Sequence, residues 1–185
     1  MRIISGTAGR LRIEAPKGLT RPSTDRLREA LFSILGNRVE NARVLDLFAG
    51  SGALGIEALS RGALSAVFVD CDRLAGKAIE RNLQHTRLAK KGTFVQRDTL
   101  PALKGLRGPF DLVFADPPYI STTQESNHGK ALLEDNVLPC LITTNGLLVL
   151  ETGDQDPPEV TADGRWVSEQ SRHYGKSHLH FFVLQ

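Results

Sequence analysis

The chain has few cysteines and no long apolar run. Two cysteines, Cys71 and Cys140, in 185 residues are too few to cross-link a chain of this length, so we expect free thiols in a reducing compartment and no disulfide. No apolar run approaches the roughly 20 residues that cross a bilayer, and the first residues lack the apolar stretch of a secretory signal. These absences exclude a disulfide-rich secreted scaffold and a membrane-spanning protein, and we expect a cytoplasmic chain with no membrane partner.

The chain also lacks a large net charge. Its 23 Lys and Arg against 21 Asp and Glu give +2, which excludes a histone-like polycation and an acidic disordered tail. However, residues 1–28 hold seven basic and two acidic residues, a net charge of +5, which leaves −3 for residues 29–185. Such a basic segment predicts a polyanionic partner, and a solvated segment without a partner is the alternative.

Short β-branched and apolar runs alternate with helical patterns. Strands are predicted at residues 43–48, 66–70, 93–95, 111–115, 146–151, 165–169 and 179–184. Helices are predicted at residues 23–35, 52–61, 72–85 and 130–142. This alternation predicts an α/β fold, a Rossmann-like doubly wound, mostly parallel sheet with helices on both faces. The last two strands should pair as an antiparallel hairpin that turns at Tyr174 and Gly175, because no crossover helix precedes them.

A glycine-rich turn follows the first predicted strand. Gly50, Gly52 and Gly55 satisfy G-x-G-x-x-G between a strand and a helix, and 20 residues after Gly50 the acidic Asp70 ends the next strand. The glycines permit close approach of a ligand to the backbone, and the carboxylate can bind both hydroxyls of a ribose. We therefore predict an adenosine-containing ligand, with a tight turn that binds nothing as the alternative.

Asp46 distinguishes two adenosine cofactors. A dinucleotide would bring a pyrophosphate with about two negative charges to the turn, and the Asp46 carboxylate would repel it. S-adenosylmethionine carries an ammonium and a sulfonium instead, which favours it over NAD. Asp98, after the third predicted strand, could reach the adenine amino group or be an ordinary loop aspartate. The predicted cofactor-binding residues are Asp46, Phe48, Ala49, Gly50, Gly52, Asp70 and Asp98.

The fourth predicted strand runs into Asp116-Pro117-Pro118-Tyr119. Open α/β sheets bind ligands outside the carboxyl ends of strands where the strand order reverses, so Asp116 should lie beside the glycine turn. The Asp116 carboxylate and the Pro117 carbonyl could each accept one N–H of an exocyclic amine, while the prolines fix the backbone. Tyr119 could stack on the base, an interaction worth on the order of 1–3 kcal/mol.

A base can reach such a site only when it is unstacked. The tetrapeptide therefore predicts methylation of a flipped or single-stranded nucleotide, with Asp116, Pro117 and Tyr119 as catalytic residues. The alternative is a strand that simply ends at two prolines.

These motifs carry a family resemblance. Residues 46–52 with residues 116–119 resemble S-adenosylmethionine-dependent amino methyltransferases of class I. Residues 2–6, 21–32 (RPSTDRLREALF) and 48–58 (FAGSGALGIEA) resemble in particular the RsmD family of bacterial 16S rRNA guanine-N2 methyltransferases, and the likeness runs nearly end to end. The resemblance implies a class I methyltransferase with a seven-stranded mixed sheet and a short basic N-terminal extension, which methylates guanine N2 of 16S rRNA in assembled or partly assembled 30S particles.

The resemblance also implies that residues 1–30 help to place the RNA. The predicted substrate-binding residues are Arg10, Arg21, Thr24, Arg28 and Pro118. Arg26 and Arg28 point to different helix faces, so at most one of them should face the RNA beside Arg21, and salt bridges to neighbouring acids are the alternative. Tyr119 stands where phenylalanine is frequent in the family, and residues 7–10 follow the family's opening loosely.

Other functions remain open from the residues alone. The tetrapeptide does not distinguish guanine N2 from adenine N6 in DNA or RNA, and a nucleotide-cofactor oxidoreductase and a non-catalytic ribosome-assembly factor are further alternatives. Cys140 follows a proline, as does the nucleophile of cytosine-C5 methyltransferases, but Asp116 occupies the loop that this chemistry needs. We expect Cys140 to pack in a helix and Cys71 to be buried at a strand end.

Three histidines lie near the C-terminus. His178 and His180 share a strand face and His173 lies near them, without an acid or thiol at metal-ligand spacing, so we expect no metal and interpret them as RNA-facing or surface residues.

The sequence predicts two regions, a basic extension with its helix at residues 1–40 and a methyltransferase domain at residues 41–185, in a monomer. Because the net charge after residue 28 is −3, RNA recognition should depend on the N-terminal segment and on the shape of the particle. Deletion of residues 1–20 should then weaken 30S binding and spare S-adenosylmethionine binding.

Overall fold

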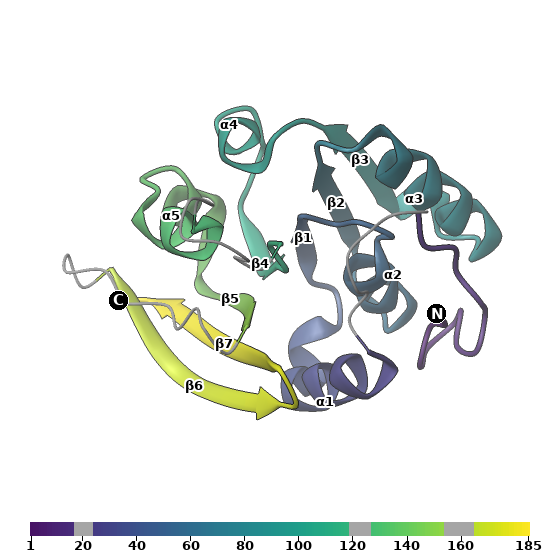
Figure 1. The fold of residues 1–185 in the computed structure, drawn as a ribbon, viewed down its shortest axis with the longest axis horizontal. Coiled ribbons are helices and arrows are strands. Elements are labelled where there is room, and N and C mark those ends of the chain that lie inside the picture. Colours follow the sequence, from purple (N-terminus) through teal and green to yellow (C-terminus); the bar gives the residue numbers. More distant parts are fainter. Residues whose placement is uncertain (17–23, 119–126, 154–164) are drawn as a thin grey trace.

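The computed structural model describes residues 1–16, 24–118, 127–153 and 165–185. Its centre is a seven-stranded sheet of order β3-β2-β1-β4-β5-β7-β6 (Figure 1). The strands are β1 (Arg43–Leu47), β2 (Ser65–Asp70), β3 (Gly92–Gln96), β4 (Phe110–Ala115), β5 (Ile142–Gly153), β6 (Trp166–Tyr174) and β7 (Ser177–Leu184). Strands β1 to β5 pair in parallel, whereas β7 is antiparallel to both β5 and β6. The predicted mixed sheet and its C-terminal hairpin are confirmed.

The strand order reverses between β1 and β4, because the chain places β2 and β3 on one side of β1 and the later strands on the other. The hairpin turns where the sequence predicted, with Gly175 at a φ of 66° between Tyr174 and Ser177. Strand β5 is longer than predicted and begins at Ile142, where the sequence had predicted the end of a helix.

The helices are α1 (Asp25–Leu35), α2 (Ala53–Ser60), α3 (Arg73–His85), α4 (Thr99–Leu103) and α5 (His128–Glu134), with short 3-10 turns η1 (Gly36–Val39), η2 (Ala89–Lys91) and η3 (Leu138–Leu141). The prediction of one helix over residues 130–142 is wrong. The Asp135 carboxylate accepts the N–H groups of Val137 and Leu138 at 2.7 and 2.8 Å, which ends α5 and starts η3. Helix α4 was not predicted.

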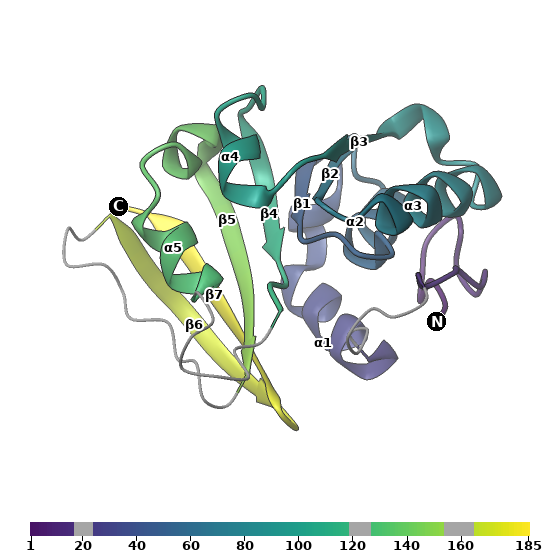
Figure 2. The same ribbon diagram turned by 45° about the horizontal axis from the view of Figure 1, so that its top comes forward.

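The sheet has a hydrophobic core on each face. Helices α1, α2 and α3 cover one face around Phe32, Phe68 and Phe114, and helices α4 and α5 cover the other around Leu103 and Leu132. Figure 2 shows the hairpin of β6 and β7 at one end of the sheet and α3 at the other. In the described part of the chain, no helix is long and apolar enough to cross a membrane.

The N-terminal segment, residues 1–14, is built into this core. Ile3, Ala8 and Ile13 are buried in the cluster that α1, α2 and α3 share. The backbone N–H groups of Ile4 and Ser5 donate to the fully buried Glu57 carboxylate of α2 at 2.6 and 3.1 Å. The predicted boundary at residue 40 therefore does not separate two cores.

This packing changes the expected outcome of a deletion. Removing residues 1–20 would uncover apolar side chains and leave the buried Glu57 without two backbone donors, which destabilises the fold. Loss of 30S binding after this deletion would therefore not distinguish a lost RNA contact from a destabilised fold.

Candidate active site

The glycine turn joins the end of β1 to α2. Phe48, Gly50 and Gly52 have φ values of 57°, 54° and 75°, which favour glycine at the last two positions. The Ala49 N–H donates to the carbonyl of Val69 at 3.0 Å and the Gly52 N–H to that of Ala49 at 2.7 Å. These bonds fix the turn against the end of β2.

Gly55 is required by close packing. A Cβ atom at this position would lie 2.3 Å from the Phe68 ring and 3.0 Å from Asp46 Oδ2. The bare backbone instead lets the Gly55 N–H donate to Asp46 Oδ2 at 2.8 Å. The third glycine of the motif therefore brings α2 close to β1 and β2.

Asp46 lies inside the protein. Its side chain is only 2% exposed, and burial raises the pKa of its carboxyl to about 8, an effect that the Gly55 N–H opposes and the charge of Asp70 adds to. The sequence predicted that Asp46 attracts the cationic methionyl end of the cofactor. The structure gives it a partner within the fold, the first turn of α2.

Asp70, the last residue of β2, lies next to the glycine turn. Its Oδ2 accepts the Gly50 N–H and its Oδ1 accepts the Asp72 N–H, both at 2.8 Å. A carboxylate has about four lone-pair sites, so each oxygen keeps one for a further donor. Asp70 can therefore hold the turn and still accept two hydroxyls of a ribose.

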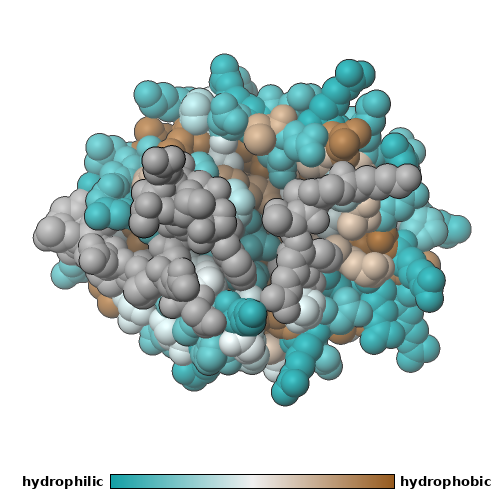
Figure 3. Space-filling view, in the orientation of Figure 1, coloured by the Kyte–Doolittle hydropathy of each residue, from teal (hydrophilic) through white to brown (hydrophobic). Residues whose placement is uncertain are grey.

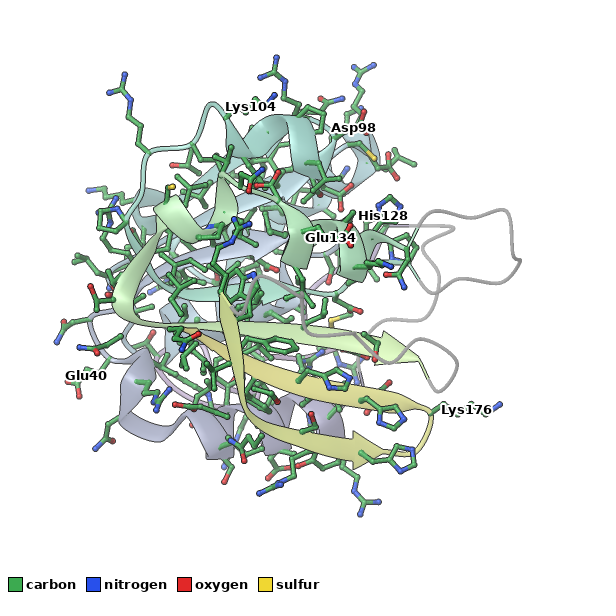
Figure 4. All side chains as sticks on the ribbon, turned by 90° about the vertical axis from the view of Figure 1, so that its left-hand side faces the viewer. Glu40, Asp98, Lys104, His128, Glu134 and Lys176 are labelled. Atoms are coloured by element: carbon green, nitrogen blue, oxygen red, sulfur yellow. The ribbon has the colours of Figure 1, made fainter. Side chains whose placement is uncertain are left out.

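Asp98 lies at the same edge of the sheet. It is exposed, it precedes the first residue of α4, and its neighbour Arg97 donates its N–H to the carbonyl of Asp70 at 3.1 Å. Figure 4 shows Asp98 and His128 on the side to which β5 points, whereas Glu40, which precedes β1, lies on the opposite side. Asp98 is thus available to a ligand at the carboxyl ends of the strands.

Asp116 leaves β4 directly beside this turn. Ala115 pairs with Leu47 in the sheet, and the Asp116 N–H lies 3.5 Å from the carbonyl oxygen of Leu47. Asp116 is half-buried, Pro117 is buried and Pro118 is exposed. The placement next to the glycine turn agrees with the expectation from strand order; Tyr119 lies outside the described residues.

His128 also lies at this edge, although the sequence did not single it out. Its ring, at the start of α5, lies 5.5 Å from that of Phe48, centroid to centroid, at an angle of 56°. Helix α5 thereby contacts the glycine turn. No motif surrounds His128 in the sequence, so only the fold identifies it.

Asn82 is a second residue that the sequence analysis missed. It is 2% exposed, and its side-chain amide donates to the carbonyls of Ser51 and Glu14, each at 2.9 Å, while its oxygen accepts the Glu14 N–H at 2.8 Å. Asn82 thus joins the glycine turn to the N-terminal segment. A polar residue among the apolar residues of the inner face of α3 was the available signal.

The predicted substrate residues are dispersed. Arg10 is exposed, and Thr24 is exposed while its hydroxyl caps α1 by accepting the Leu27 N–H at 3.2 Å. Arg28 is fully buried and donates to Asp25 at 2.8 Å, and burial lowers its pKa. Its placement favours the salt-bridge alternative over an RNA contact. Arg21 lies outside the described residues.

The cysteines and His180, for which the sequence predicted no role in the site, lie in other surroundings than predicted. Cys71 and Cys140 are both exposed rather than buried, and both are free thiols, the latter in η3 rather than in a helix. His180 is only 8% exposed and bonds to the hydroxyls of Thr152 and Ser171 at 3.0 and 2.9 Å. Burial lowers its pKa to about 4, with a smaller contribution from His178. His180 is therefore an interior residue.

The fold and the site together define an α/β protein of the class I methyltransferase type. They combine five parallel strands, an antiparallel C-terminal hairpin and a glycine turn that is bonded to Asp70 at the end of β2. A family model described as conserved hypothetical protein 95 matches residues 1–183. The chain belongs to this family, which confirms the resemblance to the RsmD family. Ribosomal RNA small subunit methyltransferase D of Escherichia coli (strain K12) is 40% identical over 138 residues, covering 74% of this chain and 68% of that protein.

Further relatives extend the likeness along the chain. The Haemophilus influenzae protein of the same name is 34% identical over 168 residues, 88% of this chain and 83% of that one. The solved structure of yhhF from Escherichia coli is 33% identical, with a TM-score of 0.81 over 100% of this chain and 98% of that one. An RNA methyltransferase from Salinibacter ruber in complex with S-adenosyl-L-homocysteine is 14% identical, with a TM-score of 0.68 over 89% and 94% of the chains. It shares the fold.

Proposed function

We propose that this protein transfers a methyl group from S-adenosylmethionine to the exocyclic N2 of a guanine in 16S rRNA, within the 30S particle. S-adenosylmethionine-dependent methylation of rRNA follows from the family, whose members include the small subunit methyltransferases D. The observation that carries the proposal is the position of Asp116 and Pro117, which leave β4 where the glycine turn leaves β1.

The residues present fit this cofactor. Asp70 retains one acceptor site on each oxygen for the two ribose hydroxyls, and Asp98 can accept from the adenine amino group. Asp46 holds the start of α2 through the Gly55 N–H, and a cationic methionyl end bound nearby would favour the ionised form of its carboxyl. When bound, S-adenosylmethionine supplies an electrophilic methyl group on sulfonium.

The tetrapeptide orients the amine. The Asp116 carboxylate and the Pro117 carbonyl each accept one N–H of the guanine amine, and this pairing turns the nitrogen lone pair towards the methyl group. Asp116 or water would then accept the surplus N–H proton of the methylated amine. Tyr119, which follows in the sequence, is the predicted stacking partner of the flipped base.

Two measurements test this function. Asp116→Ala should abolish methyl transfer to 30S particles while the affinity for S-adenosylmethionine stays within a few-fold, since Asp116 contacts the base and not the cofactor. Undiminished turnover would refute its role.

Nucleosides of 16S rRNA from a deletion strain identify the product by mass spectrometry. Loss of N2-methylguanine supports the proposal, whereas loss of N6-methyladenine would assign the protein to the other amine that the tetrapeptide accommodates. Comparison of naked 16S rRNA with 30S particles as substrates determines which of the two is recognised.

A further inference from the structure

The protein carries its positive charge on one edge. Residues 73–97 contain seven basic residues and one acid, a net charge of +6, whereas residues 98–185 contain six basic residues and twelve acids, a net charge of −6. The first stretch forms α3, η2 and β3, at the β3 end of the sheet, and the second includes the β6 end. In the described part of the second stretch, six basic residues stand against seven acids, so the described residues concentrate their positive charge in α3, η2 and β3.

All seven basic side chains of this stretch are exposed; they are Arg73, Lys77, Arg81, Arg87, Lys90, Lys91 and Arg97. The first three recur every fourth residue along α3, so they lie on the face opposite the buried residues of that helix. Among the described residues, Arg81 pairs with Glu14 at 3.0 Å, and the other six form no ion pair. Figure 3 shows mainly hydrophilic side chains along the right-hand margin, where Figure 1 places α3.

This basic surface reaches the candidate active site. Arg73 begins α3 immediately after Asp72, and Arg97 follows β3 and bonds through its N–H to the carbonyl of Asp70 at 3.1 Å. The N-terminal segment lies alongside α3, because Glu14 contacts both Asn82 and Arg81. It adds the exposed Arg10 and Arg12 to this end of the molecule.

We propose that the exposed face of α3, continued by η2 and the end of β3, binds the phosphate backbone of the RNA substrate. This inference rests on the proposed function and names the surface that function needs. A row of exposed cations that leads to the site of chemistry, of which only Arg81 forms an ion pair among the described residues, would hold the backbone while the target base reaches Asp116.

The test compares two triple variants of equal charge change. Arg73→Gln/Lys77→Gln/Lys90→Gln removes three cations from the proposed surface. Arg107→Gln/Arg172→Gln/Lys176→Gln removes three exposed cations from the acidic stretch, and these also lack ion pairs among the described residues. Binding of 16S rRNA in 30S particles is measured without turnover across a salt series, and S-adenosylhomocysteine binding serves as the folding control.

The first variant should lose three phosphate contacts. At about 0.7 per contact for single strands, the slope of log K against log salt becomes shallower by about 2, and affinity at 0.1 M salt falls on the order of 100-fold. The control variant should bind as the wild type does. Equal losses of affinity in both variants, or full affinity in the first variant, would overturn the proposal. If the first variant binds RNA as the wild type does but loses binding to an acidic protein, the surface is a protein-binding site and the proposal is wrong.

The two proposals fail separately. If the wild type binds rRNA through this surface but methylates no guanine in it, the proposed reaction is wrong and the surface stands. If the first variant binds fully and methylates with unchanged kcat/KM, the reaction stands and the surface is wrong.

Discussion

Asn82 links the cofactor turn to the N-terminal segment, so its removal should affect both stability and cofactor affinity. Asn82→Ala deletes three hydrogen bonds, two partly buried ones with the Glu14 backbone and a buried one with the Ser51 carbonyl. At about 1 kcal/mol net for each bond, the free energy of unfolding falls by about 3 kcal/mol. For a chain of this size that corresponds to a Tm lower by roughly 6–12 °C.

The effect on cofactor binding is separable from this loss. Without the hydrogen bond from Asn82 to the Ser51 carbonyl, the glycine turn is less fixed in the free protein. Cofactor binding must then order the turn, which lowers the affinity. One bond of about 1 kcal/mol predicts a Kd for S-adenosylhomocysteine raised roughly 5-fold. Isothermal titration at a temperature where the variants are folded measures this change.

Ser60→Ala is the matched control. The Ser60 hydroxyl accepts the Ala8 N–H at 2.9 Å and donates to the carbonyl of Ser5, so it holds the same segment without touching the glycine turn. This variant should also lower Tm, yet leave the Kd within about 2-fold of wild type. Unchanged cofactor affinity in Asn82→Ala, or an equal loss in both variants, would refute the linkage.

Two further predictions concern the buried core of the site. The pKa of Asp46 in the folded, ligand-free protein is about 8, above its ordinary value of 3.8. Between these two pH values the native state therefore holds one more proton than the unfolded state. The free energy of unfolding falls as pH rises through this range. Asp46→Asn should lack this component in urea unfolding at a series of pH values; identical pH dependence in both proteins would contradict the buried, protonated carboxyl. Gly55→Ala should lower the free energy of unfolding by about 1–3 kcal/mol through crowding, although alanine favours helix by about 1 kcal/mol; stabilisation would show that Phe68 can move.

Periodicity and strand-end chemistry predicted the sheet because they are local properties. The glycine turn, Asp70 and Asp116 each follow a buried strand, and parallel strands bring their carboxyl ends to one edge. The prediction of a helix over residues 130–142 was wrong because an aspartate inside an apolar pattern can bond to nearby backbone N–H groups and start a new turn. Hydrophobic spacing alone does not show whether the side chain will do so.

The contacts that fasten the N-terminal segment were not predictable in the same way. Glu57 and Asn82 are polar residues on helix faces that the fold buries, and their partners are backbone groups 53 and 68 residues away in the sequence. Such pairings depend on tertiary packing, which satisfies buried polar groups with whichever backbone lies near. The presence of a polar residue on an apolar face was visible, but its partner was not.

The distribution of charge shows why a regional sum misled the sequence analysis. The net charge of −3 for residues 29–185 is the sum of +6 in one stretch, −6 in another and a smaller acidic remainder. An RNA backbone is affected mainly by the charges within a Debye length of about 8 Å, and so by the stretch that lies nearest to it. Two of the seven bases in residues 1–28, Arg2 and Arg28, are paired with Asp25, which reduces the contribution first assigned to that stretch. Sheet order places the positive stretch at one end of the molecule, and the contacts of Glu14 with Asn82 and Arg81 place the N-terminal segment beside it. The two regions therefore form one cationic surface next to the site, and their contributions to RNA affinity should be measured together.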